Sequence, residues 1–396
     1  MLKLILIFIL SCGIYAESGL SYLNKIRSQA GLIKLKQNKY LNRASSSHAK
    51  YLVRHQVTGH TEQIGRGFYT GKRPHNRALK AGYPSAFIVE NLTINTANQK
   101  QSIDNLFSAI YHRFVFLTLE HDEIGMGSAK SKNGRRFKSA FVYDLGSSAI
   151  SQLCKNRYNI KNGVYYIKDI CKDKKKMIAK TIYNRAKDKI RLKNRSIVLF
   201  PYPNQKGISP VFYNESPDPL PKYGVSGYPI SVELNSAIYK NIRLKSFRLY
   251  SNGKEIKDTK IIKNSNDKNK IFTKYQFALM PLKRLEYNTT YTVKFDASTS
   301  KKRVTKRWSF TTTNPKGKLY RITKKNSHLK VKAGTIGILY FVPNGRNDII
   351  TRYGSRGGLK VNFIDQNTFK VKFPKRKSKG RAMLDLGTKK VIFDVI

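Results

Sequence analysis

Hydrophobic positions near the start of the chain recur every three or four residues in two separate stretches. This spacing places the apolar side chains on one face of a helix. In chain order the positions are Leu20, Leu23, Ile26 and Ala30, followed by Leu41, Ala44, His48, Tyr51 and Leu52. The pattern predicts two amphipathic helices, and it places His48 on an apolar face as a core histidine.

Residues 197–314 show a different pattern, made of the short apolar or alternating runs that are typical of strands. These runs are Ile230–Leu234, Phe247–Tyr250, Tyr275–Leu279, Tyr291–Phe295 and Trp308–Thr312. Asn252 and Gly253 directly follow the second run, and this pair predicts a two-residue hairpin turn. The segment is therefore expected to be a β domain.

Residues 315–396 continue the strand pattern and predict a small all-β domain. The runs are Leu329–Val331, Ile336–Val342, Leu359–Ile364, Phe369–Phe373 and Val391–Val395. The basic run Lys375–Lys379 stands between two of them. We interpret it as a solvated hairpin tip, with a finger that binds polyanions as the alternative.

The connecting segment, residues 148–196, carries apolar side chains at four-residue intervals among many lysines. These positions are Ile178, Ile182, Ala186 and Ile190, and they predict a basic amphipathic helix. We expect this helix to dock against a neighbouring domain, while contact with an anionic membrane surface stays open.

The chain contains three cysteines, and Cys12 belongs to its N-terminal leader. Cys154 and Cys171 are therefore predicted to form a disulfide, provided that the chain is exported. Closing so short a loop stabilises the fold by about 3 kcal/mol when chain entropy is the only term. Two buried free thiols are the alternative.

Residues 1–16 have the pattern of a secretory signal peptide: a short basic start, an apolar stretch and small residues that end at Ala16. A second interpretation treats the residues before Cys12 as a lipoprotein signal, in which case Cys12 carries lipid. No later stretch has the apolar length of a membrane span. The expected location is secreted, periplasmic or on the cell surface.

The formal net charge of +54 is spread over residues 17–147, 148–196, 197–314 and 315–396, each of which has an excess of lysine and arginine. A protein that reads nucleic acid usually concentrates its basic residues beside a recognisable module, and none is found. An even distribution of positive charge predicts salt-dependent adhesion to polyanions, here an anionic glycan or lipid of a cell or host surface. A general bias toward lysine without a binding role is the alternative.

The N-terminal third carries a series of short motifs in a characteristic order. They include Gly59-His60-Thr61, Glu90-Asn91-Leu92, His112-Arg113, Glu123–Gly127 and the strand Ala140–Gly146. Their order resembles the CAP superfamily of cysteine-rich secretory, antigen and pathogenesis-related proteins. This resemblance implies an α-β-α sandwich with a central antiparallel sheet and a large cleft.

The same resemblance implies candidate ligands for a divalent metal in that cleft. They are His60, Glu90, His112 and, as a weaker fourth candidate, Glu123. Imidazole and carboxylate groups are ligands that Zn²⁺ accepts. The departures Val89, Leu106 and Ala109–Tyr111 from the family pattern reshape the cleft wall, and a purely structural hydrogen bond between His60 and Glu90 is the competing interpretation. His55, His75, His121 and His328 are expected at the surface.

Residues 285–295 and the closing Trp308–Thr312 run resemble the immunoglobulin-like modules of bacterial surface proteins, in which Tyr291 could form a tyrosine corner. The chain is thus expected to be a multidomain α+β protein. Its predicted segments are a signal peptide at 1–16, a CAP domain at 17–147, a disulfide-clipped linker at 148–196, an immunoglobulin-like β-sandwich at 197–314 and a small all-β domain at 315–396.

The motifs of nucleophilic hydrolases, of zinc proteases and of nucleotide-binding loops are missing from the sequence. The leading functional hypothesis is an exported, non-enzymatic binding protein with a divalent-metal or small-ligand site in its cleft. A metal-assisted hydrolase acting on peptide or cell-wall material is the alternative.

Overall fold

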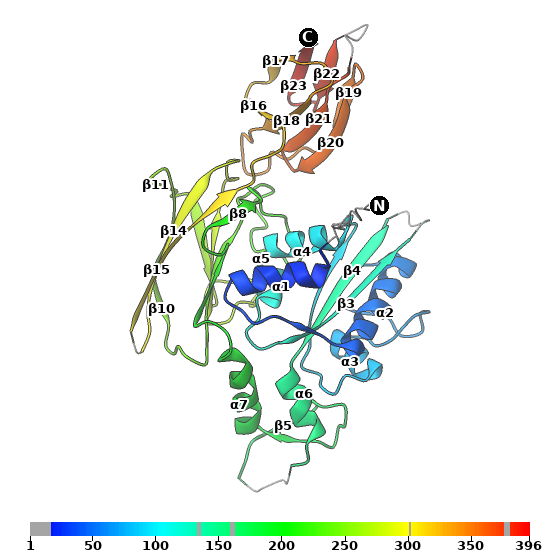
Figure 1. The fold of residues 1–396 in the computed structure, drawn as a ribbon, viewed down its shortest axis with the longest axis vertical. Coiled ribbons are helices and arrows are strands. Elements are labelled where there is room, and N and C mark those ends of the chain that lie inside the picture. Colours follow the sequence, from blue (N-terminus) through cyan, green and yellow to red (C-terminus); the bar gives the residue numbers. More distant parts are fainter. Residues whose placement is uncertain (1–16, 132, 134–135, 159–162, 301, 376–380) are drawn as a thin grey trace, which may run out of the picture.

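The computed structural model describes residues 17–131, 133, 136–158, 163–300, 302–375 and 381–396. The predicted signal peptide, Cys12 and most of the Lys375–Lys379 run lie outside the described residues. Figure 1 shows an N-terminal α/β domain beside a central β domain, with a second β domain at one end of the molecule and a small helical extension at the other. The predicted multidomain α+β architecture is confirmed.

The N-terminal domain is built on a four-stranded sheet in the order β1-β3-β4-β2. Its strands are β1 Lys36–Gln37, β2 Val89–Ile94, β3 Glu123–Lys130 and β4 Ser139–Gly146. Its helices are α1 Gly19–Gln29, α2 Lys39–His55, α3 Pro74–Ala81, α4 Gln99–Ser108 and α5 Ile110–Phe116. The two amphipathic helices predicted from the sequence are α1 and α2, and the core position of His48 is confirmed.

Side chains of β4 alternate between two helical layers. Ala140 and Val142 pack with residues of α2, whereas Phe141 and Tyr143 belong to the core that α1, α4 and α5 help to form. The α2 layer approaches the sheet closely, because a Cβ at Gly125 would lie only 2.0 Å from the backbone of Leu41. The predicted α-β-α sandwich is therefore present, and glycine at position 125 is required for it.

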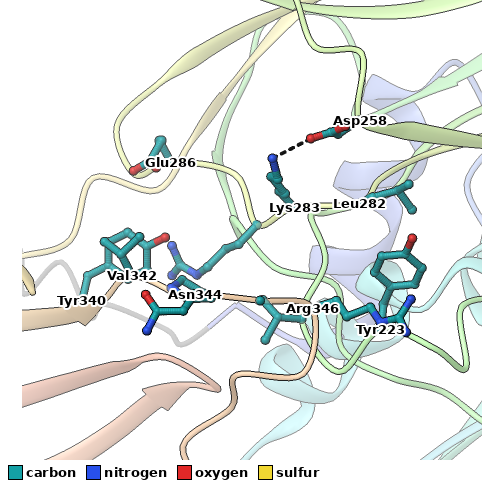
Figure 2. Close-up of a pocket in the computed structure, with 13 residues that line it drawn as sticks. Tyr223, Asp258, Leu282, Lys283, Glu286, Tyr340, Val342, Asn344 and Arg346 are labelled. Atoms are coloured by element: carbon teal, nitrogen blue, oxygen red, sulfur yellow. Dashed lines mark ion pairs between the residues drawn. The ribbon is translucent and has the colours of Figure 1, made fainter. Parts of the chain in front are cut away.

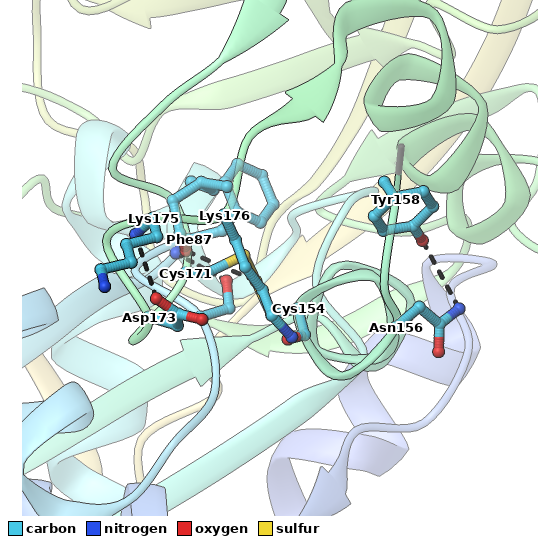
Figure 3. Close-up of a disulfide and its surroundings, with 10 residues drawn as sticks. Phe87, Cys154, Asn156, Tyr158, Cys171, Asp173, Lys175 and Lys176 are labelled. Atoms are coloured by element: carbon cyan, nitrogen blue, oxygen red, sulfur yellow. Dashed lines mark hydrogen bonds between the residues drawn. A yellow bond between two sulfur atoms is a disulfide. The ribbon is translucent and has the colours of Figure 1, made fainter. Parts of the chain in front are cut away.

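The segment 148–196 is a compact extension rather than an open linker. It contains α6 Ser148–Lys155, β5 Tyr166–Ile167, β6 Ile178–Ala179 and α7 Lys180–Arg191. The predicted disulfide between Cys154 and Cys171 is present (Figure 3), and the backbone of Cys171 also forms an isolated β-bridge with Ser85 of the N-terminal domain. The predicted helix begins later than expected, because Ile178 pairs with Ile167 in the short hairpin that precedes it.

The central domain is a sandwich of two sheets with the orders β12-β13-β9-β7 and β11-β10-β14-β15-β8. Its strands are β7 Ile197–Phe200, β8 Gln205–Ile208, β9 Ile230–Leu234, β10 Arg243–Ser251, β11 Lys254–Glu255, β12 Thr259–Lys263, β13 Gln276–Pro281, β14 Thr290–Ser298 and β15 Arg303–Thr312. In sequence order this distribution matches the immunoglobulin arrangement of strands ABED against strands CFG, with β8 parallel to β15 along one edge.

Two details of this sandwich were predicted from the sequence. Asn252 and Gly253 connect β10 to β11 with both residues at positive φ, as the hairpin turn requires. The hydroxyl of Tyr291, near the start of β14, accepts a hydrogen bond of 2.9 Å from the backbone N–H of Glu286. Tyr291 therefore forms the expected tyrosine corner.

The C-terminal domain pairs two four-stranded sheets, in the orders β16-β18-β21-β20 and β17-β23-β22-β19, around one apolar core. Its strands are β16 Lys318–Ile322, β17 Asn326–Val331, β18 Ile336–Phe341, β19 Gly354–Arg356, β20 Lys360–Asp365, β21 Thr368–Lys372, β22 Ala382–Asp385 and β23 Lys390–Val395. The predicted all-β domain is confirmed. No helix in the described part of the chain is long and apolar enough to cross a membrane.

The N-terminal and central domains share a continuous apolar core. Arg113 of α5 is fully buried at this junction and donates a 2.8 Å hydrogen bond to the carbonyl of Pro229. Its guanidinium lies 4.9 Å from the ring centres of both Phe200 and Tyr228. Burial of this kind makes the junction a fixed interface rather than a flexible hinge.

Candidate functional site

The side of the N-terminal sheet that faces α2 carries a cluster of buried polar side chains. Glu90 on β2 lies opposite Asp144 on β4 in the antiparallel register, so both carboxyl groups point toward the same helix. Arg77 of α3, His48 of α2 and Glu62 complete the buried cluster, and all five residues are less than one-tenth exposed. His60, on the loop after α2, covers it from the solvent side with a side chain that is 44% exposed.

Glu90 is held by two side-chain donors. His60 donates from Nδ1 to Oε1 of Glu90 at 2.8 Å, and Arg77 donates from Nη2 to Oε2 at 2.6 Å. Burial by itself raises the pKa of Glu90, but the hydrogen bond from His60 and the charge of Arg77 outweigh it and lower the pKa to about 2. Glu90 is therefore a carboxylate at neutral pH, and it fixes the orientation of the His60 ring.

The His48 ring connects α2 to the loop that carries His60. Its Nδ1 lies 2.9 Å from Oε1 of Glu62 and its Nε2 lies 3.1 Å from the carbonyl oxygen of Gly59. The two ring nitrogens thus bridge a carboxylate and a backbone carbonyl of the same loop. Glu62 also accepts hydrogen bonds from the backbone N–H groups of Thr70 and Gly71, so the loop is closed at its base.

Asp144 is the second buried carboxyl group of the cluster. Burial, followed by the charge of Glu90, raises the pKa of Asp144 well above its usual range. Its Oδ2 accepts a 2.8 Å hydrogen bond from the hydroxyl of Ser45, while its Oδ1 has no partner among the described residues. The environments of the two neighbouring carboxyl groups thus shift their pKa values in opposite directions, downward for Glu90 and upward for Asp144.

His112 lies outside this cluster. It is on α5, which packs on the other face of the sheet, and its Nδ1 lies 2.7 Å from Oε2 of Glu215 in the central domain. The same carboxylate accepts a hydrogen bond of 3.1 Å from the backbone N–H of Tyr111. His112 thus contributes to the contact between two domains.

Glu123 is likewise engaged elsewhere, at the start of β3. Its Oε2 accepts a 2.7 Å hydrogen bond from the hydroxyl of Tyr83, and its Oε1 accepts one of 2.9 Å from the side chain of Asn38. Asn38 is the N-cap of α2. Glu123 therefore positions the beginning of that helix.

The structure brings together two of the four predicted metal ligands, His60 and Glu90, and places His112 and Glu123 with other partners. Within the described ranges, no group of three or more His, Cys, Asp and Glu side chains has positions that could hold a metal ion. The four residues do not fit a single metal centre in this arrangement. Of the predicted set only His60 and Glu90 lie together, and a divalent metal bound in the cleft stays a prediction.

Sequence reasoning missed the contributions of Glu62 and Asp144 to the cluster. Glu62 lies only two residues after His60, and this short spacing was an available signal. Asp144 is the one acidic residue of the otherwise apolar β4. A carboxyl group inside such a strand indicates a buried partner, because an unpaired buried charge is costly.

The prediction of His121 as a surface residue was wrong. Its side chain is buried, its ring lies 4.5 Å from that of Phe87, and its Nδ1 lies 2.9 Å from the hydroxyl of Thr118. The extension that carries α7 covers His121. The acidic sequence neighbours Glu120 and Asp122 gave no sign of this burial. Burial lowers the pKa of His121 to about 4.

Comparison with known proteins agrees with the fold of the N-terminal domain. Residues 20–144 match the model of CAP, the cysteine-rich secretory protein family. The N-terminal domain is a CAP domain. A comparison with curated proteins finds no match.

Several solved structures share part of the fold with this CAP-domain protein. An outer surface protein from Borrelia burgdorferi is 18% identical, with 32% of this chain and 88% of that chain covered and a TM-score of 0.28. An extracellular protein containing an SCP domain from Bacillus anthracis is 13% identical, with 33% and 39% covered and a TM-score of 0.28. A titin structure, Titin-A168169, is 12% identical, with 51% of this chain and 100% of that chain covered and a TM-score of 0.16.

Proposed function

We propose that the chain is an exported, non-enzymatic protein that adheres to an anionic glycan or lipid surface. The observation that carries this proposal is the distribution of its acidic groups. Six of them are buried, namely Glu62, Glu90, Asp122, Asp144, Asp267 and Asp365. Many others form ion pairs, so the solvent-facing surface is dominated by lysine and arginine.

Adhesion of this kind depends on salt, since binding releases counterions from the polyanion. The test is retention of the full chain on immobilised heparin and on vesicles that contain anionic lipid, measured over a series of NaCl concentrations. We expect retention at about 0.15 M salt, where the Debye length is about 8 Å, and loss at about 1 M. If the chain binds neither heparin nor the anionic vesicles at about 0.15 M NaCl, the proposal is overturned.

The CAP domain is proposed to hold a divalent metal or a small ligand at His60. The Nδ1 atom of His60 is fixed by Glu90, and the ring is partly exposed, so the second nitrogen is available to a ligand. We propose to titrate Zn²⁺ into the full chain and into two variants. His60→Ala should abolish binding and His112→Ala should leave it unchanged, because His112 faces Glu215. A wild type that binds no Zn²⁺ removes the metal from the proposal.

A metal-assisted hydrolase that acts on peptide or cell-wall material is the second candidate. The contact between His60 and Glu90 favours it, since a carboxylate-oriented imidazole can serve as a ligand or a base. Catalytic zinc sites usually use three protein ligands, and the described residues bring only these two together. Hydrolysis of such a substrate by the Zn²⁺-loaded wild type and its loss in His60→Ala would favour this candidate.

A further inference from the structure

The junction between the central and C-terminal domains encloses a cavity of about 360 Å³. Figure 2 shows its lining, to which both domains contribute. From the central domain come Tyr223, Val225, Asp258, Leu282, Lys283, Arg284 and Glu286, and from the C-terminal domain come Tyr340, Val342, Pro343, Asn344, Gly345 and Arg346. A volume in this range suits a small ligand.

The acidic groups around the cavity are already neutralised. Asp258 pairs with Lys283 at 2.6 Å, and Glu286 pairs with Arg321. In contrast, Arg346 is exposed and has no ion pair among the described residues; its guanidinium lies 5.8 Å from the ring centre of Tyr223. The cavity therefore presents one uncompensated positive charge beside an aromatic ring.

A second cation of the lining also has an unused donor. Arg284 is almost fully buried, and its Nε has no hydrogen-bond partner within the described part of the chain. Its other nitrogens are engaged by Asp365, Thr368 and the carbonyl of Leu285. This N–H group has almost no accessible surface, so Arg284 contributes to the wall by packing rather than by a donor that is open to the cavity.

The position of Arg346 is fixed before any ligand binds. Its backbone carbonyl accepts a 2.9 Å hydrogen bond from the N–H of Val225, and the side chain of the next residue, Asn347, accepts one of 3.1 Å from the N–H of Gly224. These bonds attach the loop of the C-terminal domain to the central domain. A loop whose backbone is already held in place loses less conformational entropy on binding than a free loop.

The remaining wall is apolar and aromatic, through Leu282, Val342, Pro343, Tyr223 and Tyr340. A ligand that fits must therefore combine a flat or amphipathic ring with an anionic group. An acidic saccharide has both features, since its ring face packs on aromatic side chains and its carboxylate or sulfate pairs with a guanidinium.

We propose that this interdomain cavity binds one acidic saccharide unit, with its carboxylate or sulfate group on Arg346 and its ring against Tyr223. The inference rests on the proposed adhesion to anionic glycans and gives that adhesion a specific subsite. The general positive field attracts the polymer, and the cavity selects a ring that carries an anion.

The test uses the full chain and a fluorescent heparin tetrasaccharide, with a neutral tetrasaccharide of N-acetylglucosamine as the uncharged probe. Arg346→Gln removes the charge and keeps the backbone hydrogen bond to Val225. Arg54→Gln is the matched control, because Arg54 is exposed on α2 and has no ion pair among the described residues. We expect Arg346→Gln to weaken tetrasaccharide binding by about tenfold or more, and Arg54→Gln to change it by less than about twofold.

Equal weakening by the two substitutions would overturn the cavity proposal, because it would show that only the general charge matters. Equal binding of the neutral tetrasaccharide would overturn it as well. Tyr223→Leu provides an independent check, since it removes the ring and keeps the charge; it should weaken the tetrasaccharide while retention on polymeric heparin persists. If the wild type binds polymeric heparin but not the tetrasaccharide, only the proposed saccharide binding in the cavity is contradicted. If the wild type binds neither, the proposed function is contradicted as well.

Discussion

The guanidinium of Arg284 lies 2.7 Å from the carboxylate of Asp365, and this ion pair joins the central domain to the C-terminal domain. Both side chains are almost fully buried. The hydroxyl of Tyr287 donates a second hydrogen bond to Asp365, also of 2.7 Å, and the rings of Tyr287 and Tyr340 lie 4.5 and 4.2 Å from the guanidinium carbon. The contact is thus a buried ion pair, supported by a tyrosine hydroxyl, inside the interface between the two domains.

Asp365→Ala is expected to destabilise the protein by about 3–5 kcal/mol, because it leaves the charge of Arg284 buried without its partner. The measurement is the free energy of unfolding in urea. Lys283→Ala is the control, since its pair with Asp258 is exposed and contributes little. If the two variants unfold at the same urea concentration, the buried pair does not stabilise the junction.

His121 should make the protein sensitive to mild acid. The pKa of this residue is lowered from 6.5 to about 4 by burial, so the unfolded chain takes up a proton that the folded chain does not. The contribution of neutral His121 to the free energy of unfolding is about 3 kcal/mol. It is complete above pH 6.5 and is lost as the pH falls toward 4. In His121→Phe this component of the loss should be missing, as seen by urea denaturation at about pH 7 and about pH 4. His328→Phe, at a position outside the buried core, should keep the wild-type pH profile.

Glu233 should have the opposite dependence. One of its carboxylate oxygens is buried without a partner among the described residues, and burial raises its pKa from 4.5 to about 8. Because the folded state prefers the protonated form, its contribution to stability is complete below pH 4.5 and is lost as the pH rises through 8. Glu233→Gln should therefore stabilise the protein at alkaline pH, with a gain that grows between pH 4.5 and 8. Glu255→Gln, an exposed change in the same domain, should give no such gain in thermal denaturation.

Removal of the disulfide should loosen the extension locally. The cysteines are 17 residues apart, and the loss of this link costs about 3 kcal/mol when the effect is entropic. In Cys154→Ala/Cys171→Ala, hydrogen exchange should become faster in the hairpin of β5 and β6. Exchange in β3 and β4 should be unchanged, and equal acceleration in both regions would contradict a local role.

Much of the fold was accessible from the sequence because its elements have clear periodicity. The strand Ile230–Leu234 was predicted with the bounds that β9 has, and the helical spacing of Leu41 and Leu52 located α2. The strand β19 was missed, since it is exposed over its whole length and carries no hydrophobic signal. Strands of this kind depend on pairing with a neighbour rather than on local composition.

The candidate site was predictable only where it lies within one domain. The motifs that contain His60 and Glu90 lead directly to the buried cluster. His112 could not be assigned, because its partner Glu215 belongs to another domain and is separated from it by 103 residues. A resemblance that is confined to residues 20–144 carries no information on such a contact. The cavity at Arg346 was missed for the same reason.

The last strand, β23, lies inside its sheet, where it pairs in parallel with β17 and antiparallel with β22. The parallel register extends over six residue pairs, from Asn326 with Lys390 to Val331 with Val395. A pulling force applied at the C-terminal end along this strand would load the hydrogen bonds of both ladders together instead of breaking them one after another. Resistance of the C-terminal domain to such a force would therefore reside in β23 and its two ladders.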